Sequence, residues 1–142
     1  MEDDSAAPLR GTSRPLRKKN VSTKNDLVGF TKICLALPEA TRQLHGDYAR
    51  FLVRKKVFAY YLDNHHGDGI VAVACKVLPG DNVALTTVDP DRFYLPAYIG
   101  SRGWVALRLD LGEIDWDEVT EIVIGSYRLV APRRLGALIG NT

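Results

Sequence analysis

The side chains best suited to bind a ligand are cations placed where the chain turns between two expected strands. Arg54, Lys55 and Lys56 separate two runs of strand-forming residues. A hairpin tip with three positive charges can lie along a nucleic-acid backbone, because each ion pair with a phosphate releases condensed counterions. Four later cations could extend that surface: Lys76, Arg92, Arg102 and Arg108. The alternative is an ordinary solvated turn, and the residue types leave both interpretations open.

Aromatic residues are interleaved with these cations along the chain. They are Tyr60, Tyr61, Phe93, Tyr94 and Tyr98. Any of these rings that faces solvent could stack on unpaired bases. The favoured interpretation is that they fill one face of a sheet.

A second group of residues could converge where the last helix meets the sheet, forming a small-molecule or protein-partner site. Its members are Lys56, Lys76, Trp104, Ser126 and Arg128. No Gly-x-Ser-x-Gly, phosphate loop or dinucleotide fingerprint accompanies them, so we predict no enzyme and no catalytic residue. In the plainer interpretation Tyr127 packs and Arg128 is solvated. The Ser126 hydroxyl then bonds back to the carbonyl of Ile122 in its own helix.

Possible metal ligands are concentrated in one turn, at Asp63, His65, His66 and Asp68. Adjacent histidines in an extended segment point apart, whereas a metal site needs ligands that converge. A solvated hairpin tip is therefore favoured. Cys34 and Cys75 lack Cys-x-x-Cys spacing and are expected to be buried thiols. We predict no metal and no cofactor.

Composition indicates one globular domain. Hydrophobic residues make up 46% and charged residues 25% of the 142 residues, close to globular averages. The net charge of +2 is uneven, because residues 1–24 carry six basic and three acidic side chains. The remainder is thus close to neutral. No apolar run is long enough to span a bilayer and residues 1–20 lack the apolar core of a signal peptide, so a cytoplasmic protein with no membrane association is expected.

Two helices are predicted, one near each end of the domain. The first runs from Ser22 to Leu37, with Ser22 or Thr23 as its cap and a loop after Pro38. The last begins at the cap Asp115, with Glu118 reaching back to the cap N–H, and stops at Pro132. Residues 1–21 are expected to be a disordered basic leader, residues 22–132 the domain, and residues 133–142 a loose extension.

Strand patterns occupy the region between the two helices. Three strands forming a meander, one edge strand and a final alternating strand are predicted at residues 51–53, 57–62, 70–77, 93–96 and 104–109. A short helical turn is expected at residues 82–87. Because no strand–helix–strand alternation occurs, the fold is predicted to be α+β: an antiparallel sheet of about five strands with the N- and C-terminal helices packed on one face.

Several local strings, in order, resemble the MmcQ/YjbR family of small bacterial proteins between Leu27 and Val130. They are Cys34 to Thr41, Lys56 to Ala59 with Lys76, Tyr98 to Gly100, Gly103 to Val105, and Ser126 to Val130. The resemblance implies a fold like that of the frataxin-related CyaY proteins. It also implies a proposed double-wing DNA-binding role, in which β-hairpins contact DNA. It brings no agreed catalytic residues.

Frataxins bind iron through an acidic surface, and the segment from Glu113 to Glu118 is similarly acidic. Acidic residues at a helix start are, however, what capping and the helix dipole favour. The function expected is therefore weak, salt-sensitive DNA binding with little sequence preference.

Overall fold

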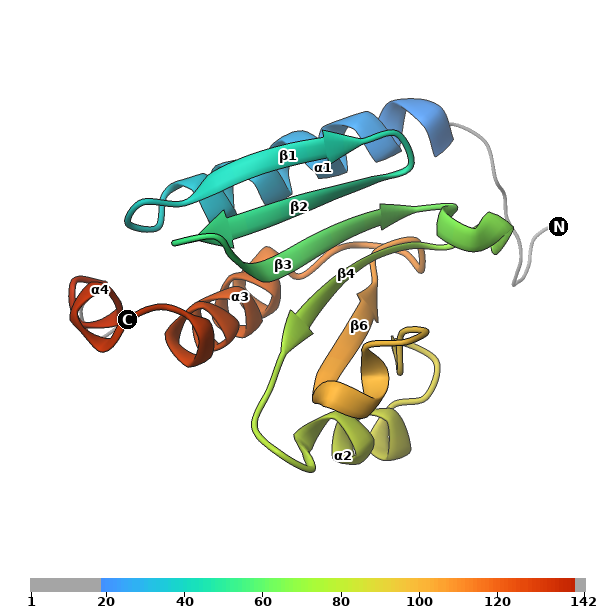
Figure 1. Ribbon diagram of the computed structural model, residues 1–142. Coiled ribbons are helices and arrows are strands. Elements are labelled where there is room, and N and C mark those ends of the chain that lie inside the picture. The colour runs from blue at the N-terminus through green and yellow to red at the C-terminus, as the bar shows by residue number, and fades with distance from the viewer. Residues whose placement is uncertain (1–18, 140–142) are drawn as a thin grey trace, which may run out of the picture.

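The computed structural model describes residues 19–139, and the fold is a single antiparallel sheet with helices against it (Figure 1). The sheet order is β1 (Thr41–His45), β2 (Tyr48–Val53), β3 (Lys56–Asp63), β4 (Val71–Lys76), β6 (Trp104–Arg108) and β5 (Phe93–Tyr94). The helices are α1 (Lys19–Leu35), α2 (Asp81–Val88), α3 (Trp116–Val130) and α4 (Arg133–Ala137). The described residues also include the short 3₁₀ turns η2 (His65–Gly67) and η3 (Gly100–Arg102). The α+β prediction is confirmed.

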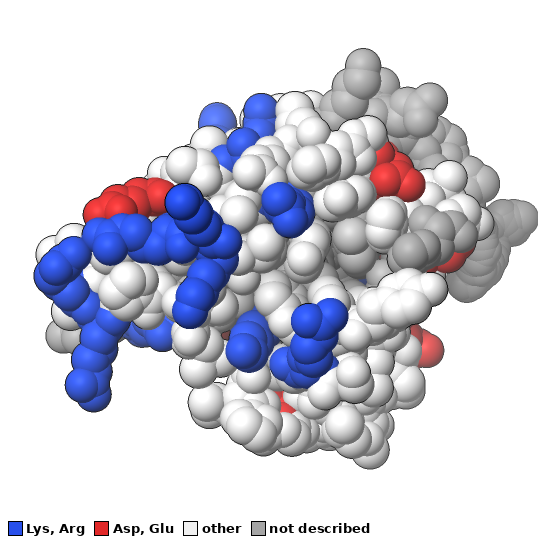
Figure 2. All heavy atoms as spheres, in the orientation of Figure 1, with Lys and Arg blue, Asp and Glu red and all other residues white. Residues whose placement is uncertain are grey.

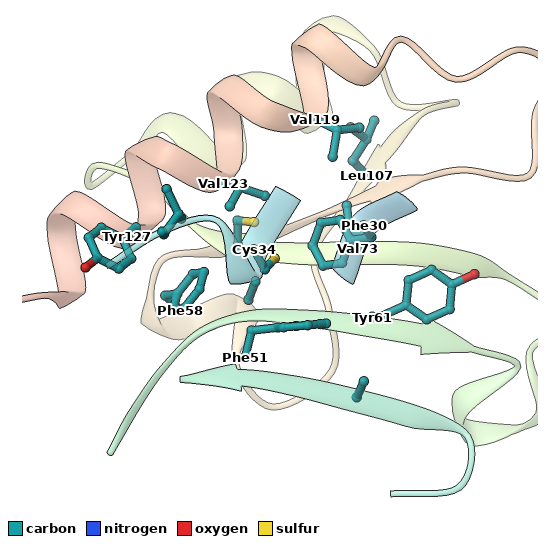
Figure 3. Packing of buried hydrophobic residues seen from close by; sticks show 14 of the residues in the cluster. Phe30, Cys34, Phe51, Phe58, Tyr61, Val73, Leu107, Val119, Val123 and Tyr127 are labelled. Carbon is teal, nitrogen blue, oxygen red and sulfur yellow. The ribbon is translucent and has the colours of Figure 1, made fainter. Parts of the chain in front are cut away.

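The main core lies between the sheet and the helices α1 and α3 (Figure 3). Phe30 of α1 meets Phe51 of β2 edge to face, with ring centroids 5.3 Å apart. Phe58 of β3 meets Tyr127 of α3 in the same way, also at 5.3 Å. We call this covered side of the sheet the inner face. Its packing joins α1 and α3, the first and last long helices of the described residues, to the same face of the sheet.

The opposite side of the sheet, the outer face, carries a second and smaller apolar cluster. Along β6, Val105 belongs to the inner core, whereas Trp104 and Ala106 belong to the outer cluster. The predicted alternation is thereby confirmed. The buried amide of Asn82 in α2 donates to the carbonyls of Gly100 (2.9 Å) and Trp104 (3.2 Å), which holds α2 and η3 beside β6.

The N-terminal part of the domain differs from prediction in two places. The helix α1 begins at Lys19, so Ser22 and Thr23 lie within it and do not cap it. The predicted loop after Pro38 instead contains strand β1, paired with β2 from Thr41–Leu52 to His45–Tyr48. All five residues of β1 are exposed, so this edge strand has no apolar alternation to reveal it. The sheet therefore has six strands and not five.

The C-terminal part agrees better. The carboxylate of Asp115 accepts from the N–H groups of Asp117 and Glu118, both at 3.1 Å, which confirms the predicted cap. Glu118 does not reach back to the cap, because it pairs with an arginine described below. The predicted loose extension is wrong, since α4 buries Leu135 in the main core. The proposed leader, residues 1–21, falls almost entirely outside the described residues, as do residues 140–142.

Candidate nucleic-acid interface

The β2–β3 turn is a tight two-residue connection. Arg54 (φ 50°) and Lys55 (φ 69°) both adopt the left-handed conformation that such hairpin turns require. Val53 pairs with Lys56 directly across the turn. The side chains of Lys55 and Lys56 are exposed at the hairpin tip. The structure thus places these two predicted cations where a phosphate backbone could reach them.

Arg54, the third cation of the turn, is already engaged. Its guanidinium forms a two-point ion pair with Glu39, with Nε–Oε1 at 2.5 Å and Nη2–Oε2 at 3.0 Å. The hydrogen bond from Arg54 lowers the pKa of the Glu39 carboxyl, and the nearby charge of Arg134 lowers it further. The positive charge of Arg54 is therefore compensated while Glu39 is ionised.

Arg92 and Arg108 are also paired with carboxylates. Arg92 donates to Asp89 (2.7 Å) and to both oxygens of Glu118 (2.7 and 3.0 Å). The hydrogen bonds to Glu118 and Asp89 raise the pKa of Arg92. Arg108 donates twice to Asp110, at 3.0 and 3.1 Å. The backbone N–H of Arg108 donates to the carbonyl of Arg92 (2.8 Å), so the two arginines lie together at the C-terminal end of β6.

The remaining predicted cations gather at the opposite end of the sheet. Lys56 begins β3, Lys76 ends β4, and Arg102 lies just before β6; because neighbouring strands are antiparallel, these positions share one end. We call this region the basic end and include the arginines of α4. Its members are Lys55, Lys56, Lys76, Arg102, Arg133 and Arg134. None of them forms an ion pair with a carboxylate of residues 19–139.

Figure 2 shows the cations of this end on the molecular surface. Lys and Arg side chains gather over the β2–β3 turn and α4, with further cations beside the neighbouring ends of β4 and β6. The contribution of α4 was missed from the sequence, because residues 133–142 were expected to be loose. The available signal was Leu135, an apolar residue two positions after Arg133 that anchors the segment in the core.

A buried serine shapes this end of the sheet. Phe51 pairs with Ala59 and Leu52 with Val57, so Phe58 is an extra residue that forms a bulge in β3. The fully buried Ser126 hydroxyl donates to the carbonyl of Phe58 (2.6 Å) and accepts from the N–H of Lys76 (2.9 Å). It thereby satisfies two backbone groups where the β3–β4 ladder opens. The predicted bond from Ser126 to Ile122 is wrong.

The predicted pocket around the last helix is not assembled. Ser126 lies in the inner core with its hydroxyl fully used, whereas Trp104 packs on the outer face, so the sheet separates the two. Lys56 and Lys76 belong to the basic end. Arg128 is exposed on α3, where its aliphatic part lies against α4: a Cβ added at Gly136 would be 3.5 Å from Cγ of Arg128.

The predicted aromatic group is divided between the two faces. Tyr61 and Phe93 pack in the inner core. Tyr60 and Tyr94 pack on the outer face, and Tyr98 is 82% exposed. The expectation that all five rings fill one face of the sheet is therefore wrong, because Tyr60 and Tyr94 lie on the other face from Tyr61 and Phe93.

The other reactive side chains form no obvious chemical centre. Nδ1 of His65 lies 3.2 Å from Oδ1 of Asp47, which links the η2 turn to the β1–β2 turn. No three His, Cys, Asp or Glu side chains within the described range are grouped to hold a metal ion. Cys34 and Cys75 are buried free thiols, and burial raises the pKa of both. Both thiols are therefore poor nucleophiles.

Comparisons with known proteins agree with this architecture. The model of the YjbR family matches residues 35–129, which include every strand and most of α3. The chain belongs to the YjbR family. A search of curated proteins found no match.

Two solved structures show the same fold as this YjbR protein. Deinococcus radiodurans protein DR2400, which carries a DUF419 domain, has 21% identity and a TM-score of 0.59, over 75% of this chain and 76% of that one. A protein from Pseudomonas syringae has 15% identity and a TM-score of 0.53, over 82% of this chain and 99% of that one. Within the described residues, no helix is long and apolar enough to cross a membrane.

Proposed function

We propose that this YjbR protein is a non-enzymatic DNA-binding protein that contacts phosphates through its basic end. The observation that carries the proposal is the set of cations at that end without carboxylate partners among the described residues. Exposed lysines at a hairpin tip retain their full charge for phosphates, and each contact releases counterions.

The charge distribution supports binding through one end even though the domain is close to neutral. Acidic residues concentrate at the start of α3, where Asp115, Asp117 and Glu118 lie near the paired arginines. The C-terminal end of α3 leads instead into α4 and the basic end. A protein with such a charge separation can be steered to a polyanion by its positive end, because the local potential and not the net charge acts at short range.

The expected mode of binding has little sequence preference. Lys55 and Lys56 are flexible point charges, suited to phosphates and less suited to the two-point recognition of a base edge that arginine provides. Three of the four predicted arginines, at positions 54, 92 and 108, are engaged by carboxylates, so only lysines remain available at the hairpin tip. Backbone contact is therefore favoured over base readout.

The test is a titration of the full chain with random-sequence duplex DNA at several salt concentrations. Each phosphate contact contributes about −0.9 to the slope of log affinity against log salt, so Lys55→Ala with Lys56→Ala is expected to reduce the slope by about 2. The matched control is Lys32→Ala with Arg42→Ala, which removes two exposed cations elsewhere. If the control lowers the slope as much as the test variant does, binding does not use the basic end.

A second control addresses the leader. Replacing Arg14, Arg17 and Lys18 with Ala in the full chain removes three charges outside the described residues. The proposal expects the effect of the Lys55 and Lys56 substitutions to persist in that background. Complete loss of binding with the leader charges alone would assign DNA binding to the leader and overturn the proposal.

A further inference from the structure

The outer face contains an open groove of about 680 Å³, distinct from the basic end. One wall is formed by Tyr48, Tyr60 and Leu62 of β2 and β3, and the other by Tyr94 with the segment from Pro96 to Ile99. This volume lies within the range of about 300–1,000 Å³ that is typical of small-molecule sites.

Small residues lie beneath the aromatic rings of the outer face. On the outer face β4 carries Ala72 and Ala74, and β6 contributes Ala106; all three are fully buried. Larger rings stand beside them, with Tyr60 5.4 Å from Trp104 between ring centroids. Tyr60 also lies 6.3 Å from Tyr48. A flat ring could therefore lie in the groove against aromatic walls.

The groove also holds Arg50, which forms no ion pair with a carboxylate of the described residues, although the carboxylate of Asp68 lines the groove as well. Nε of Arg50 donates to the side-chain oxygen of Gln43 at 3.0 Å, and Nη2 donates to the same oxygen. Glutamine orients the guanidinium but leaves its charge intact, in contrast to the carboxylates that pair with Arg54, Arg92 and Arg108. An oriented guanidinium is suited to a carboxylate or phosphate.

Tyr98 supplies an independent observation at the rim of the groove. Its φ of 69° is left-handed, a conformation that is unfavourable for a bulky side chain, and the residue is 82% exposed. Glycine or asparagine would adopt this conformation more readily. Residues with such strained backbone conformations cluster at functional sites.

We propose that this groove binds a planar aromatic organic anion, with its ring between the tyrosines and its anionic group on Arg50. The ligand class follows from the aromatic walls together with the guanidinium of Arg50, which Gln43 orients. Aryl carboxylates and mononucleotides share this chemistry, and the experiment distinguishes them. The site is separate from the proposed DNA contacts, because none of its lining residues belongs to the basic end.

The experiment is an NMR titration of the isotope-labelled full chain with two matched pairs of probes. The first pair is 2-naphthoate and its neutral analogue 2-naphthamide; the second is AMP and adenosine. Within the preferred pair the anion is expected to bind about tenfold more tightly, the effect of one charge-assisted hydrogen bond pair. Shifts are expected at Tyr48, Tyr60 and Tyr94. Preference for one pair identifies the source of the ligand.

Two variants test the assignment. Arg50→Gln is expected to remove the preference for the anion. Arg42→Gln is the control, because it makes the same charge change on the inner side of β1, where Arg42 bonds Thr31. This control should leave the preference for the anion intact. Tyr98→Asn should weaken binding several-fold without loss of folding, since asparagine tolerates the left-handed conformation.

Three results would overturn the proposal: equal affinity for anion and neutral analogue, equal effects of the Arg50 and Arg42 variants, or no binding of either pair at millimolar concentration. Duplex titration of Arg50→Gln separates this proposal from the DNA-binding one. The slope of log affinity for duplex DNA against log salt is expected to be the same for Arg50→Gln as for the unmodified protein. Either proposal can therefore fail without the other.

Discussion

The two ends of the sheet carry the same kind of cation in opposite states. At the end of β6 where α3 begins, Arg92 and Arg108 are held by Asp89, Asp110 and Glu118. At the basic end, the lysines of the β2–β3 turn have no carboxylate partner among the described residues. A count of cations therefore does not measure binding capacity. Availability depends on which carboxylates the fold brings beside each cation.

The largest expected effect concerns the serine that supports the basic end. Ser126→Ala removes the hydroxyl that bonds the backbone carbonyl of Phe58 and the backbone N–H of Lys76, leaving one buried and one part-buried group without that partner. An unsatisfied buried group costs about 1–3 kcal/mol and the part-buried Lys76 N–H costs less than that, so a loss of about 2–4 kcal/mol in the free energy of unfolding is expected. Urea denaturation measures this change in the free energy of unfolding.

The control for this prediction is Ser101→Ala, which removes an exposed hydroxyl in η3. It should change the free energy of unfolding by less than about 0.5 kcal/mol. Equal effects of the two variants would show that the Ser126 bridge does not support the β3–β4 divergence.

The next effect separates the two ends directly. Arg92→Met breaks the ion pairs with Asp89 and Glu118 but retains much of the aliphatic stem. A partly exposed pair network of this kind contributes about 1 kcal/mol, so modest destabilisation is expected with an unchanged salt slope for duplex DNA. Urea denaturation and DNA titration of the same variant provide the two readings. A fall in the slope would place Arg92 in the DNA interface.

A smaller change should convert a paired arginine into an available one. Glu39→Gln removes the carboxylate that compensates Arg54 at the edge of the basic end. One more phosphate contact would steepen the log–log salt slope by about 0.9 and tighten binding at low salt. Asp81→Asn is a control with the same charge change on an exposed residue. Identical gains in both variants would indicate a general charge effect.

The smallest effect is the pH dependence of the same pair. The pKa of Glu39 is lowered in the folded protein, chiefly by the hydrogen bond from Arg54. Its stabilising contribution is thus present above the unfolded pKa of about 4.3 and is lost as pH falls through the lower folded value. Below that range Glu39 is protonated and no longer compensates the charge of Arg54. Because Glu39→Gln has no carboxyl to protonate, its free energy of unfolding should lack the fall at acidic pH that Glu39 causes. Urea denaturation between neutral and acidic pH checks it.

The outer groove adds a further contrast with the basic end. Its aromatic residues were visible in the sequence, but their division between the two faces was not. The bulge at Phe58 shifts the alternation in β3, so Phe58 and Ala59 both face the inner core. A strict period of two cannot anticipate such a shift.

The sequence alone determined what depends on near neighbours in the chain. The Asp115 cap, the alternation along Trp104 to Leu109 and the helical stripe of α3 are local patterns, and each is confirmed because such patterns follow backbone geometry. Only the tertiary structure decided which cations are available. Arg54 meets Glu39 across 15 positions, Arg92 meets Glu118 across 26, and Ser126 meets Phe58 across 68. Hydrogen bonds and ion pairs act over a few ångströms in space, so their partners are chosen by packing and not by spacing along the chain.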